Sequence, residues 1–269
     1  MSVTKAVVMA RGLGSRMRRD AGADLRPDQA EAAASGAKAM MPVGERPFLD
    51  HSLSRLAAAG ITDVCLVVAP DHEEIRSYYD AQPLSRITVH YAVQAEPRGT
   101  ADAIAAAADF TGRDRFVAVN GDNLYPVPAL RALLASRGSA VIGFAPSVLI
   151  SESNIPEERL DAFAVLTRDP DGALTAIVEK PTPEQAAAFG RHPMVSMNCW
   201  LFEPTIQDAC RRIGPSVRGE YEVVDAVRLL MTEGVRFDVI PVAAGVLDLS
   251  SRGDVPAVTS FLEADRVRL

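Results

Sequence analysis

The sequence has little cysteine and little histidine, and this excludes several kinds of site. Its three cysteines (Cys65, Cys199 and Cys210) form no CxxC pair and no even-numbered framework, so they predict buried thiols in a reducing compartment. The four histidines lie far apart in the chain and make no HExxH or similar cluster. A zinc site and a Ser-His-Asp triad are therefore not expected.

Positive charge and long apolar runs are also scarce. The formal net charge is -7 and the pI is about 5.2, which argues against a nucleic-acid-binding protein because such proteins present a basic face. No apolar stretch approaches the roughly 18 residues needed to span a bilayer. The apolar start, residues 6–10, is too short for a signal peptide. We therefore expect a cytoplasmic protein that has neither a nucleic acid nor a membrane as a partner.

The sequence does contain enough apolar material for a full core, since 48% of its 269 residues are hydrophobic. In the first half, short apolar runs alternate with amphipathic segments. These predict strands at residues 6–10, 64–69, 88–93 and 116–120, and helices at residues 48–59, 72–79 and 100–110. Such alternation is typical of a parallel sheet that helices cover on both faces.

The second half is richer in strands. Predicted strands cover residues 141–145, 163–167, 174–178, 196–202 and 237–242, and predicted helices cover residues 184–189, 205–211, 222–232 and 255–264. Two polar stretches, residues 18–37 and 147–161, predict long loops, which in a compact domain are often functional. We predict an α/β fold with a Rossmann-like mixed, mostly parallel central sheet flanked by helices, in a single domain over residues 1–269.

An arginine-rich glycine loop follows the first predicted strand, in the stretch MARGLGSRMRRD (residues 9–20). The loop lacks the second glycine and the lysine of a P-loop, and Met17 stands where the fingerprint GxGxxG has its third glycine. Its arginines would repel one another unless they are solvated or face an anion. From this stretch alone, a solvated basic loop and a polyphosphate site both stay open.

Further candidate residues follow other predicted strands. Asp122 in VNGDNLYP and Asp248 in VLDLSS come after apolar strands, where an acid can hold a metal or start a turn. Gly99 in VQAEPRGTADAI opens a helix and lets a ligand approach the backbone closely. Lys38 precedes the apolar run AMMPV. VEKP (residues 178–181) places the acidic Glu179 and the basic Lys180 at the end of another predicted strand.

In this order, the motifs resemble those of the sugar-1-phosphate nucleotidyltransferases, also called NDP-sugar pyrophosphorylases. MARGLGSRM and KAMMPV are similar to the family signature LAxGxGTRL…KxφφPV, in which φ is apolar. VQAEPRGTADAI resembles the family's base-contacting turn, NGDN its metal-binding Asp and VLDLSS its second metal-binding strand end. VEKP and RGEYEVVDAV (residues 218–227) are similar to its sugar and sugar-phosphate segments. The resemblance runs from Ala6 to about Val258 and implies the GT-A-like fold of these enzymes.

The resemblance also implies a role for each matched residue. Arg16, Lys38 and Asp122 are implied in catalysis, and Asp122 and Asp248 are implied to hold Mg²⁺. The residues implied to bind the nucleotide are Ala10, Gly12, Gly14, Ser15, Gln94, Gly99 and Thr100. The residues implied to bind the sugar phosphate are Glu179, Lys180, Asn198 and Arg218. The NTP-binding half is expected at about residues 1–125 and the sugar-phosphate half at about residues 126–269.

Several positions depart from the family pattern. Arg11 stands where the family has a small residue beside the base, and Ala164 and Asn198 replace glycines that many relatives have near the sugar. Asp248 lacks the usual preceding Trp and following Gly-Thr, and the segment between the glycine loop and KAMMPV is longer than usual. The base and the sugar therefore stay open, although RGTADAI favours an adenylyl or thymidylyl enzyme.

The implied reaction joins an NTP to a sugar-1-phosphate or a related cyclitol phosphate, giving an NDP-sugar and pyrophosphate. The second pKa of a phosphate monoester is about 6, so the nucleophile is ionised at pH 7 and needs no general base. Because one anion attacks another, catalysis depends on charge neutralisation and alignment by cations. Two alternatives stay open: a nucleotide-sugar-dependent glycosyltransferase, for which GDN offers one acid and no DxD pair, and a non-catalytic protein that binds a sugar nucleotide. Whether the chain forms a homo-oligomer is also left open.

Overall fold

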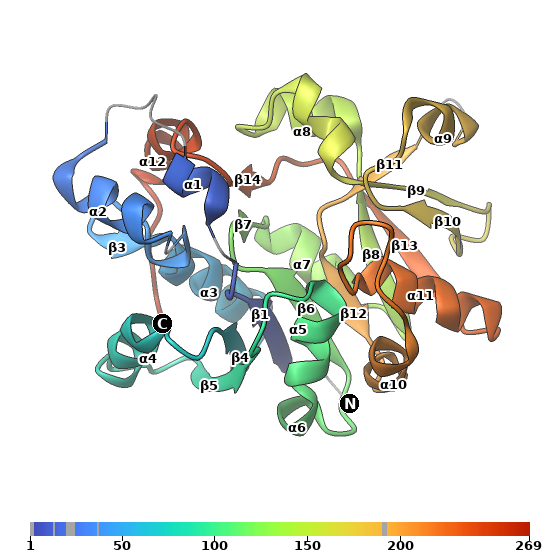
Figure 1. Ribbon diagram of the computed structural model, residues 1–269, viewed down its shortest axis with the longest axis horizontal. Helices are drawn as coiled ribbons and strands as arrows, with labels where there is room; N and C mark the ends of the chain where they lie inside the picture. The colour runs from blue at the N-terminus through green and yellow to red at the C-terminus, as the bar shows by residue number, and fades with distance from the viewer. Residues whose placement is uncertain (1–2, 13, 20–24, 37, 190–192) are drawn as a thin grey trace.

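The computed structural model describes residues 3–12, 14–19, 25–36, 38–189 and 193–269. Figure 1 shows a central sheet that runs through the molecule with helices on both of its faces. Within the described residues this sheet has ten strands, drawn from both halves of the chain. The predicted α/β fold with a mixed central sheet is therefore confirmed.

The first half of the chain forms the parallel part of the sheet. Its strands are β1 (Lys5–Met9), β4 (Asp63–Val68), β5 (Thr88–Val93) and β6 (Phe116–Asn120). They lie side by side in the order β6-β1-β4-β5, and each pairing is parallel. The helices among them are α3 (Phe48–Ala59), α4 (Glu73–Asp80), α5 (Thr100–Ala106) and α6 (Ala108–Thr111). Because parallel strands end at the same edge, the loops after β1, β4 and β6 meet there.

The second half extends the sheet, mostly with antiparallel strands. These strands are β8 (Ser139–Phe144), β9 (Ala164–Arg168), β10 (Leu174–Val178), β11 (Met194–Ser196), β12 (Trp200–Phe202) and β13 (Phe237–Val242). They continue the sheet as β10-β9-β11-β8-β12-β6, and β13 pairs with β8 in parallel. The strand predicted over residues 196–202 was wrong in extent, because Asn198 has a left-handed backbone (φ 54°) and separates β11 from β12.

The remaining elements are short or lie outside the central sheet. The helices of the second half include α7 (Val127–Leu134), α9 (Pro183–Ala188), α10 (Thr205–Arg212), α11 (Val223–Thr232) and α12 (Asp254–Leu262). Two small antiparallel pairs join β2 (Pro42–Val43) to β3 (Arg46–Pro47) and β7 (Asn123–Leu124) to β14 (Leu247–Asp248). The second pair brings Asp248 from the end of the chain beside Asn123. None of the helices in the described part of the chain is long and apolar enough to span a membrane.

Two stretches predicted to be loops contain helices. Residues 18–37 include the end of α1 (Ser15–Arg19) and all of α2 (Pro27–Ser35), and η1 (Lys38–Met40) follows. Residues 147–161 include most of α8 (Pro146–Glu152) and of η2 (Glu157–Ala162). Helix α2 has Pro27 in its first turn and ends at Gly36, which has a left-handed backbone (φ 79°). Because residues 18–37 are polar and rich in alanine, the sequence predicted a loop there. Pro27 and Gly36 nevertheless mark the two ends of a helix.

Alternate residues of the central strands pack into separate cores on the two faces of the sheet. In β1, Ala6 and Val8 belong to a core under α3, α4 and α7, whereas Val7 belongs to a core under α5, α10 and α11. A third, smaller core joins α1, α2 and α12, and Met17 of α1 is fully buried in it. The three cysteines are buried, as predicted. These cores fix the strand ends and the short helices that surround the candidate site.

Candidate active site

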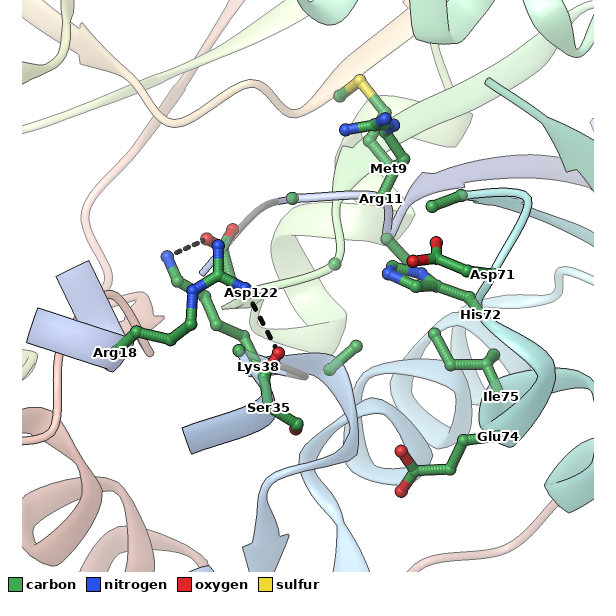
Figure 2. Close-up of a pocket in the computed structure, with 16 residues that line it drawn as sticks. Met9, Arg11, Arg18, Ser35, Lys38, Asp71, His72, Glu74, Ile75 and Asp122 are labelled. Carbon is green, nitrogen blue, oxygen red and sulfur yellow. Dashed lines mark hydrogen bonds and ion pairs between the residues drawn. The ribbon is translucent and has the colours of Figure 1, made fainter. Parts of the chain in front are cut away.

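A cavity of about 290 Å³ opens where the loops after β1, β4 and β6 meet (Figure 2). Its wall comes from the glycine loop (residues 9–12), Arg18 of α1, the end of α2, the start of η1, the loop after β4 with the first turn of α4 (residues 69–75), and residues 121–122. Four of the predicted site residues line it: Ala10, Gly12, Lys38 and Asp122. The motifs after β1 and β6 therefore come together at one edge of the sheet, as the strand pattern predicts.

The two predicted phosphate-binding glycines differ in their surroundings. Gly14 has a left-handed backbone (φ 57°), and a Cβ at this position would overlap the backbone of Gly36. Gly14 therefore lets the loop pack closely on the end of α2. By contrast, nothing lies within 4 Å of the place where a Cβ of Gly12 would be, and Gly12 lines the cavity. The backbone of Gly12 is thus open to a phosphate group. Ser15 begins α1 directly after this loop.

Arg11 ties the glycine loop to the end of β5. Its Nε donates to the carbonyl of Gln94 (3.1 Å), and its Nη2 donates to the carbonyl of Ala95 (3.2 Å). Arg11 also lines the cavity. The arginine that replaces the family's small residue therefore cross-links the loop after β1 to the turn after β5.

Two arginines of α1 lie on different sides of the helix. Arg18 lines the cavity, and its Nη1 donates to the carbonyl of Ser35 (3.3 Å; Figure 2). Arg16 is exposed and, among the described residues, does not belong to the cavity wall. Residues two apart on an α-helix differ by about 200° in direction, which accounts for the difference. The catalytic role of Arg16 stays a prediction, and Arg18 is a second candidate that sequence reasoning did not assign.

Lys38 and Asp122 form an ion pair on the cavity wall. Lys38 begins η1, Asp122 follows β6, and its Oδ2 lies 3.3 Å from Nζ of Lys38 (Figure 2). The two residues are 84 positions apart in the sequence, yet both were predicted to take part in catalysis. Their side chains are 16% and 31% exposed, so a phosphate or a cation in the cavity can reach them.

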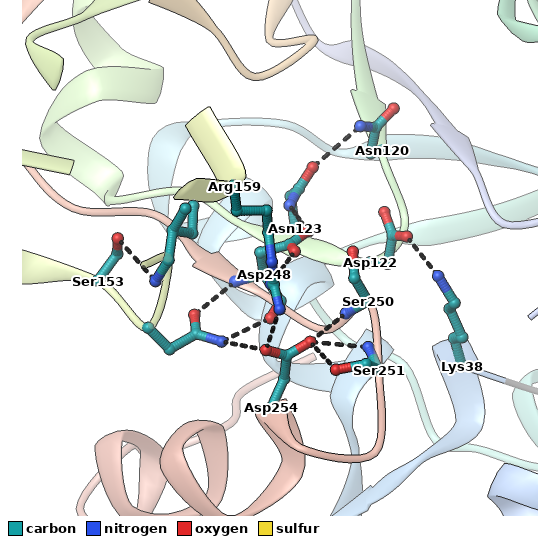
Figure 3. Close-up of polar contacts among 12 residues, drawn as sticks. Lys38, Asn120, Asp122, Asn123, Ser153, Arg159, Asp248, Ser250, Ser251 and Asp254 are labelled. Carbon is teal, nitrogen blue, oxygen red and sulfur yellow. Dashed lines mark hydrogen bonds and ion pairs between the residues drawn. The ribbon is translucent and has the colours of Figure 1, made fainter. Parts of the chain in front are cut away.

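Asp248 lies close to this pair but is enclosed by protein. The pairing of β14 with β7 sets Asp248 opposite Asn123, and the N–H of Leu249 donates to the carbonyl of Asp122 (2.9 Å). Both carboxylate oxygens of Asp248 accept hydrogen bonds, from Nδ2 of Asn123 (2.8 Å) and from Nη1 of Arg159 (2.9 Å; Figure 3). Burial, together with the charge of Asp122, raises the pKa of Asp248 to about 6.

The two predicted Mg²⁺ ligands therefore fit the ion unequally. Asp122 is partly exposed on the cavity wall, whereas both oxygens of Asp248 are already used by protein donors. Across residues 3–12, 14–19, 25–36, 38–189 and 193–269, no group of three or more His, Cys, Asp and Glu side chains could hold a metal ion. Mg²⁺ often binds to one carboxylate together with phosphate oxygens and water, and Asp122 suits that arrangement.

The predicted base-contacting turn packs against the predicted sugar-phosphate segment. Gly99 has a left-handed backbone (φ 118°), and a Cβ at this position would overlap the backbone of Tyr221. The N–H of Tyr221 donates to the carbonyl of Arg98 (2.7 Å), and the N–H of Val223 donates to Oγ1 of Thr100 (2.9 Å). The sequence suggested that the absence of a side chain at Gly99 makes room for a ligand. In the structure, the backbone of Tyr221 occupies that space.

Gln94, also predicted to face the base, is held within this turn. Its side chain is buried, and Nε2 donates to the carbonyl of Gly99 (3.0 Å) and to Oδ2 of Asp102 (2.9 Å). Gln94 therefore fixes the shape of the turn through its amide. Its contact with a base stays a prediction, as do those of Gly99 and Thr100.

The predicted sugar-phosphate residues include two with unusual backbones. Lys180 (φ 45°) and Asn198 (φ 54°) are the non-glycine residues with a positive φ in the described part of the chain. Each such residue costs about 1–3 kcal/mol, and such residues cluster at functional sites.

Nη2 of Arg218 lies 2.6 Å from Oε1 of Glu222 and 4.0 Å from Oε1 of Glu179. Arg218 and Glu179, 39 positions apart by number, are thus brought together as predicted.

The replacement Glu179→Gln is expected to stabilise the protein above pH 7 and not at pH 4.5. Burial, reinforced by the charge of Glu222, raises the pKa of Glu179 to about 7, although Arg218 and Lys180 oppose the shift. The folded chain thus holds a proton that the unfolded chain releases near pH 4.5, so stability falls as pH rises from about 4.5 to 7. We expect a gain of about 1–3 kcal/mol in the free energy of unfolding at pH 8.

Urea denaturation at pH 4.5 and pH 8 measures this difference. Glu158→Gln is the control, because Glu158 is exposed on η2. An equal effect of Glu179→Gln at both pH values would contradict the shifted pKa.

Sequence reasoning missed several residues of the site. Arg159 and Asn154 lie in a stretch predicted to be a loop, and nothing in their spacing links them to Asp248. Asp71 and His72 line the cavity from the loop after β4, and their position directly after a parallel strand was a signal that could have found them. Arg18 was seen but was assigned only to the start of a loop.

Known proteins that resemble this chain in sequence are nucleotidyltransferases. The sequence matches the family described as Nucleotidyl transferase over residues 5–248. The low-salt glycan biosynthesis nucleotidyltransferase Agl11 of Haloferax volcanii is 30% identical, over 87% of this chain and 59% of its own length. A glucose-1-phosphate thymidylyltransferase of Streptomyces griseus is 31% identical, over 98% of this chain and 66% of its own length. The chain thus spans less than two thirds of the length of these two relatives.

Other relatives are closer to this chain in length. The UTP–glucose-1-phosphate uridylyltransferase AglF of Haloferax volcanii is 27% identical, over 91% of this chain and 90% of its own length. A solved UDP-glucose pyrophosphorylase in complex with UDP-glucose superposes with a TM-score of 0.78 at 16% identity, over 98% of this chain and all of that one. This likeness shows a shared fold. Because the family match runs from β1 to Asp248, and so includes the whole sheet and the Lys38–Asp122 pair, the chain belongs to the nucleotidyl transferase family.

Proposed function

We propose that the chain transfers a nucleotidyl group from an NTP to a sugar-1-phosphate, giving an NDP-sugar and pyrophosphate. The observation that carries this proposal is the Lys38–Asp122 ion pair beside the open backbone of Gly12, in one cavity at the ends of parallel strands. Such a cavity can bind a triphosphate, because Lys38 supplies positive charge, Asp122 can hold a metal ion and the backbone of Gly12 is accessible to a phosphate group. The family match supports the same reaction.

The residues fall on two sides of the phosphate that is transferred. Lys38, with Arg16 or Arg18, would neutralise the leaving pyrophosphate, and Lys180 and Arg218 would hold the attacking sugar phosphate. Mg²⁺, when bound by Asp122, would supply positive charge to the phosphate oxygens. The attacking oxygen is already ionised near neutral pH, so these residues need to bind and align their substrates and need not move a proton.

The contacts between Gly99–Thr100 and Tyr221–Val223 support the alignment that this reaction needs. They join the turn predicted to face the base to the segment that carries Arg218. The nucleotide and the sugar phosphate would therefore bind to two parts of the chain that are packed directly on each other. Correct placement of two reactants can contribute several kcal/mol to catalysis.

We further propose a pyrimidine nucleoside triphosphate and glucose-1-phosphate as substrates. Relatives named for thymidylyl and uridylyl transfer to glucose-1-phosphate support this choice. A pyrophosphate-release screen of dTTP, UTP, ATP, CTP and GTP against a panel of sugar-1-phosphates, with Mg²⁺, tests it. A nucleotide-sugar-dependent glycosyltransferase or a non-catalytic binding protein would release no pyrophosphate with any pair.

Arg16→Ala is expected to lower turnover by a factor of about 10², because the leaving pyrophosphate loses a charged partner. Steady-state pyrophosphate release measures the effect, with Arg18→Ala assayed beside it. Arg137→Ala is a matched control, since Arg137 is exposed on the loop after α7. Normal turnover of Arg16→Ala together with a large loss in Arg18→Ala would transfer the predicted role to Arg18.

A further inference from the structure

Arg159 of η2 stands between two buried carboxylates (Figure 3). Its Nη1 donates to Oδ2 of Asp248 (2.9 Å), and its Nη2 donates to Oδ1 of Asp254 (2.8 Å). The side chains of these aspartates are 4% and 5% exposed. A planar guanidinium can bridge two carboxylates in this way, whereas the single ammonium group of a lysine is less suited to it.

The other oxygens of both carboxylates also accept hydrogen bonds. Nδ2 of Asn123 donates to Oδ1 of Asp248 (2.8 Å). Oδ2 of Asp254 accepts from the backbone N–H groups of Ser250 (3.0 Å) and Ser251 (2.7 Å), and from Oγ of Ser251 (3.0 Å). Each oxygen of Asp248 thus has one protein donor and the side chain is 4% exposed, so little of this carboxylate is open to a cation.

The main chain of Asp248 is fixed as firmly as its side chain. Nδ2 of Asn154 donates to the carbonyl of Asp248 (2.7 Å), and the N–H of Asp248 donates to Oδ1 of Asn154 (2.9 Å). The next residue, Leu249, donates to the carbonyl of Asp122 (2.9 Å). The cluster thus joins the segment of α8 and η2 to β14 and α12, and through Leu249 to the cavity wall.

We propose that Asp248 is committed to Arg159 and does not ligate the catalytic Mg²⁺, which Asp122 holds without a second aspartate. Asp122 differs from Asp248 in being partly exposed, in lining the cavity and in pairing with the ammonium group of Lys38. The Asp248–Arg159 ion pair then has a structural role: it stabilises the part of the cavity wall that contains Asp122. This inference rests on the proposed function, because it concerns the ion of that reaction.

Calorimetric binding of a nucleotide in the presence of Mn²⁺ tests the assignment. The probes are the α,β-methylene analogues of dTTP, UTP, ATP, CTP and GTP, which cannot undergo transfer, and the analogue that binds the wild-type chain is carried forward. Asp122→Asn is expected to weaken Mn²⁺-dependent binding at least about tenfold. Asp248→Asn is expected to lower the Tm but to keep the affinity within about threefold of the wild type.

A double variant keeps the test decisive where Asp248→Asn fails to fold. Arg159→Met with Asp248→Leu replaces the Arg159–Asp248 pair by apolar side chains of similar size, which buried sites often tolerate. Asp254 loses its contact with Arg159 but keeps its hydrogen bonds from Ser250 and Ser251. We expect this variant to bind the probe within about threefold of the wild type. A loss in either Asp248 variant as large as that in Asp122→Asn overturns the inference. If no probe binds the wild-type chain with Mn²⁺, the proposed function itself fails, which is a different result.

Discussion

Asp122→Asn is expected to lower turnover by a factor of about 10²–10³, the largest effect that we predict for a single replacement. The amide keeps the size of the side chain but removes the charge that would hold Mg²⁺ on the α-phosphate. Asp122 is 31% exposed and pairs only loosely with Lys38 at 3.3 Å, so its replacement leaves the buried core untouched. We therefore expect the loss in turnover with little change in Tm.

Pyrophosphate release at saturating substrates, measured alongside thermal unfolding, checks this prediction. Asp109→Asn serves as the matched control, because Asp109 is exposed on α6, far from the strand ends that form the cavity. Raising the Mg²⁺ concentration should restore part of the turnover if the variant has lost affinity for the ion. Turnover of Asp122→Asn close to that of the control would remove Asp122 from the mechanism.

The parallel half of the fold was predictable because β1, β4 and β6 are nearly continuous apolar runs and amphipathic helices lie between the strands. Once β1, β4 and β6 are parallel neighbours, the residues that follow them must meet at one edge. This is why Gly12 and Asp122, which are more than a hundred positions apart, could be assigned to one site from the sequence. Lys38 was assigned to the same site because KAMMPV resembles a family motif. The position of Lys38 in the sequence did not by itself indicate a role.

Other parts of the site could not be predicted because they depend on contacts between distant segments. Arg159 is 89 positions from Asp248, and only the docking of η2 onto β14 and α12 brings them together. Gly99 was expected to make room for a ligand, but the nearest backbone is that of Tyr221. In both cases the residue type was informative, and the partner was set by tertiary packing.

The departure at Arg11 also acquires a physical reason from the structure. A glycine or alanine at this position could not reach the carbonyls of Gln94 and Ala95, to which Arg11 donates. In this chain the loop after β1 and the turn after β5 are therefore held together by a side chain. Predicted nucleotide-binding residues lie on both segments, so Arg11 helps to set the distance between them.

Lys38→Ala is expected to lower turnover by a factor of about 10² and to raise the KM for pyrophosphate in the reverse reaction by about tenfold. Without substrate, Nζ of Lys38 neutralises Asp122 from 3.3 Å. With Mg²⁺ bound at Asp122, the ion would balance the charge of that carboxylate, and Nζ of Lys38 would be available to the phosphates of the leaving group. The variant removes this second role, so binding of pyrophosphate and the transition state are weakened together.

The split between kcat and KM separates this role from a structural one. Loss of folding would lower the fraction of active enzyme and leave KM unchanged, whereas loss of a phosphate contact changes KM for pyrophosphate. Lys5→Ala is the matched control, because Lys5 begins β1 at the opposite end of that strand from the cavity and pairs with Asp114. Lys38→Arg should recover little activity, since a larger, planar guanidinium must fit where a side chain only 16% exposed now lies. An unchanged KM for pyrophosphate in Lys38→Ala would show that Lys38 serves Asp122 alone.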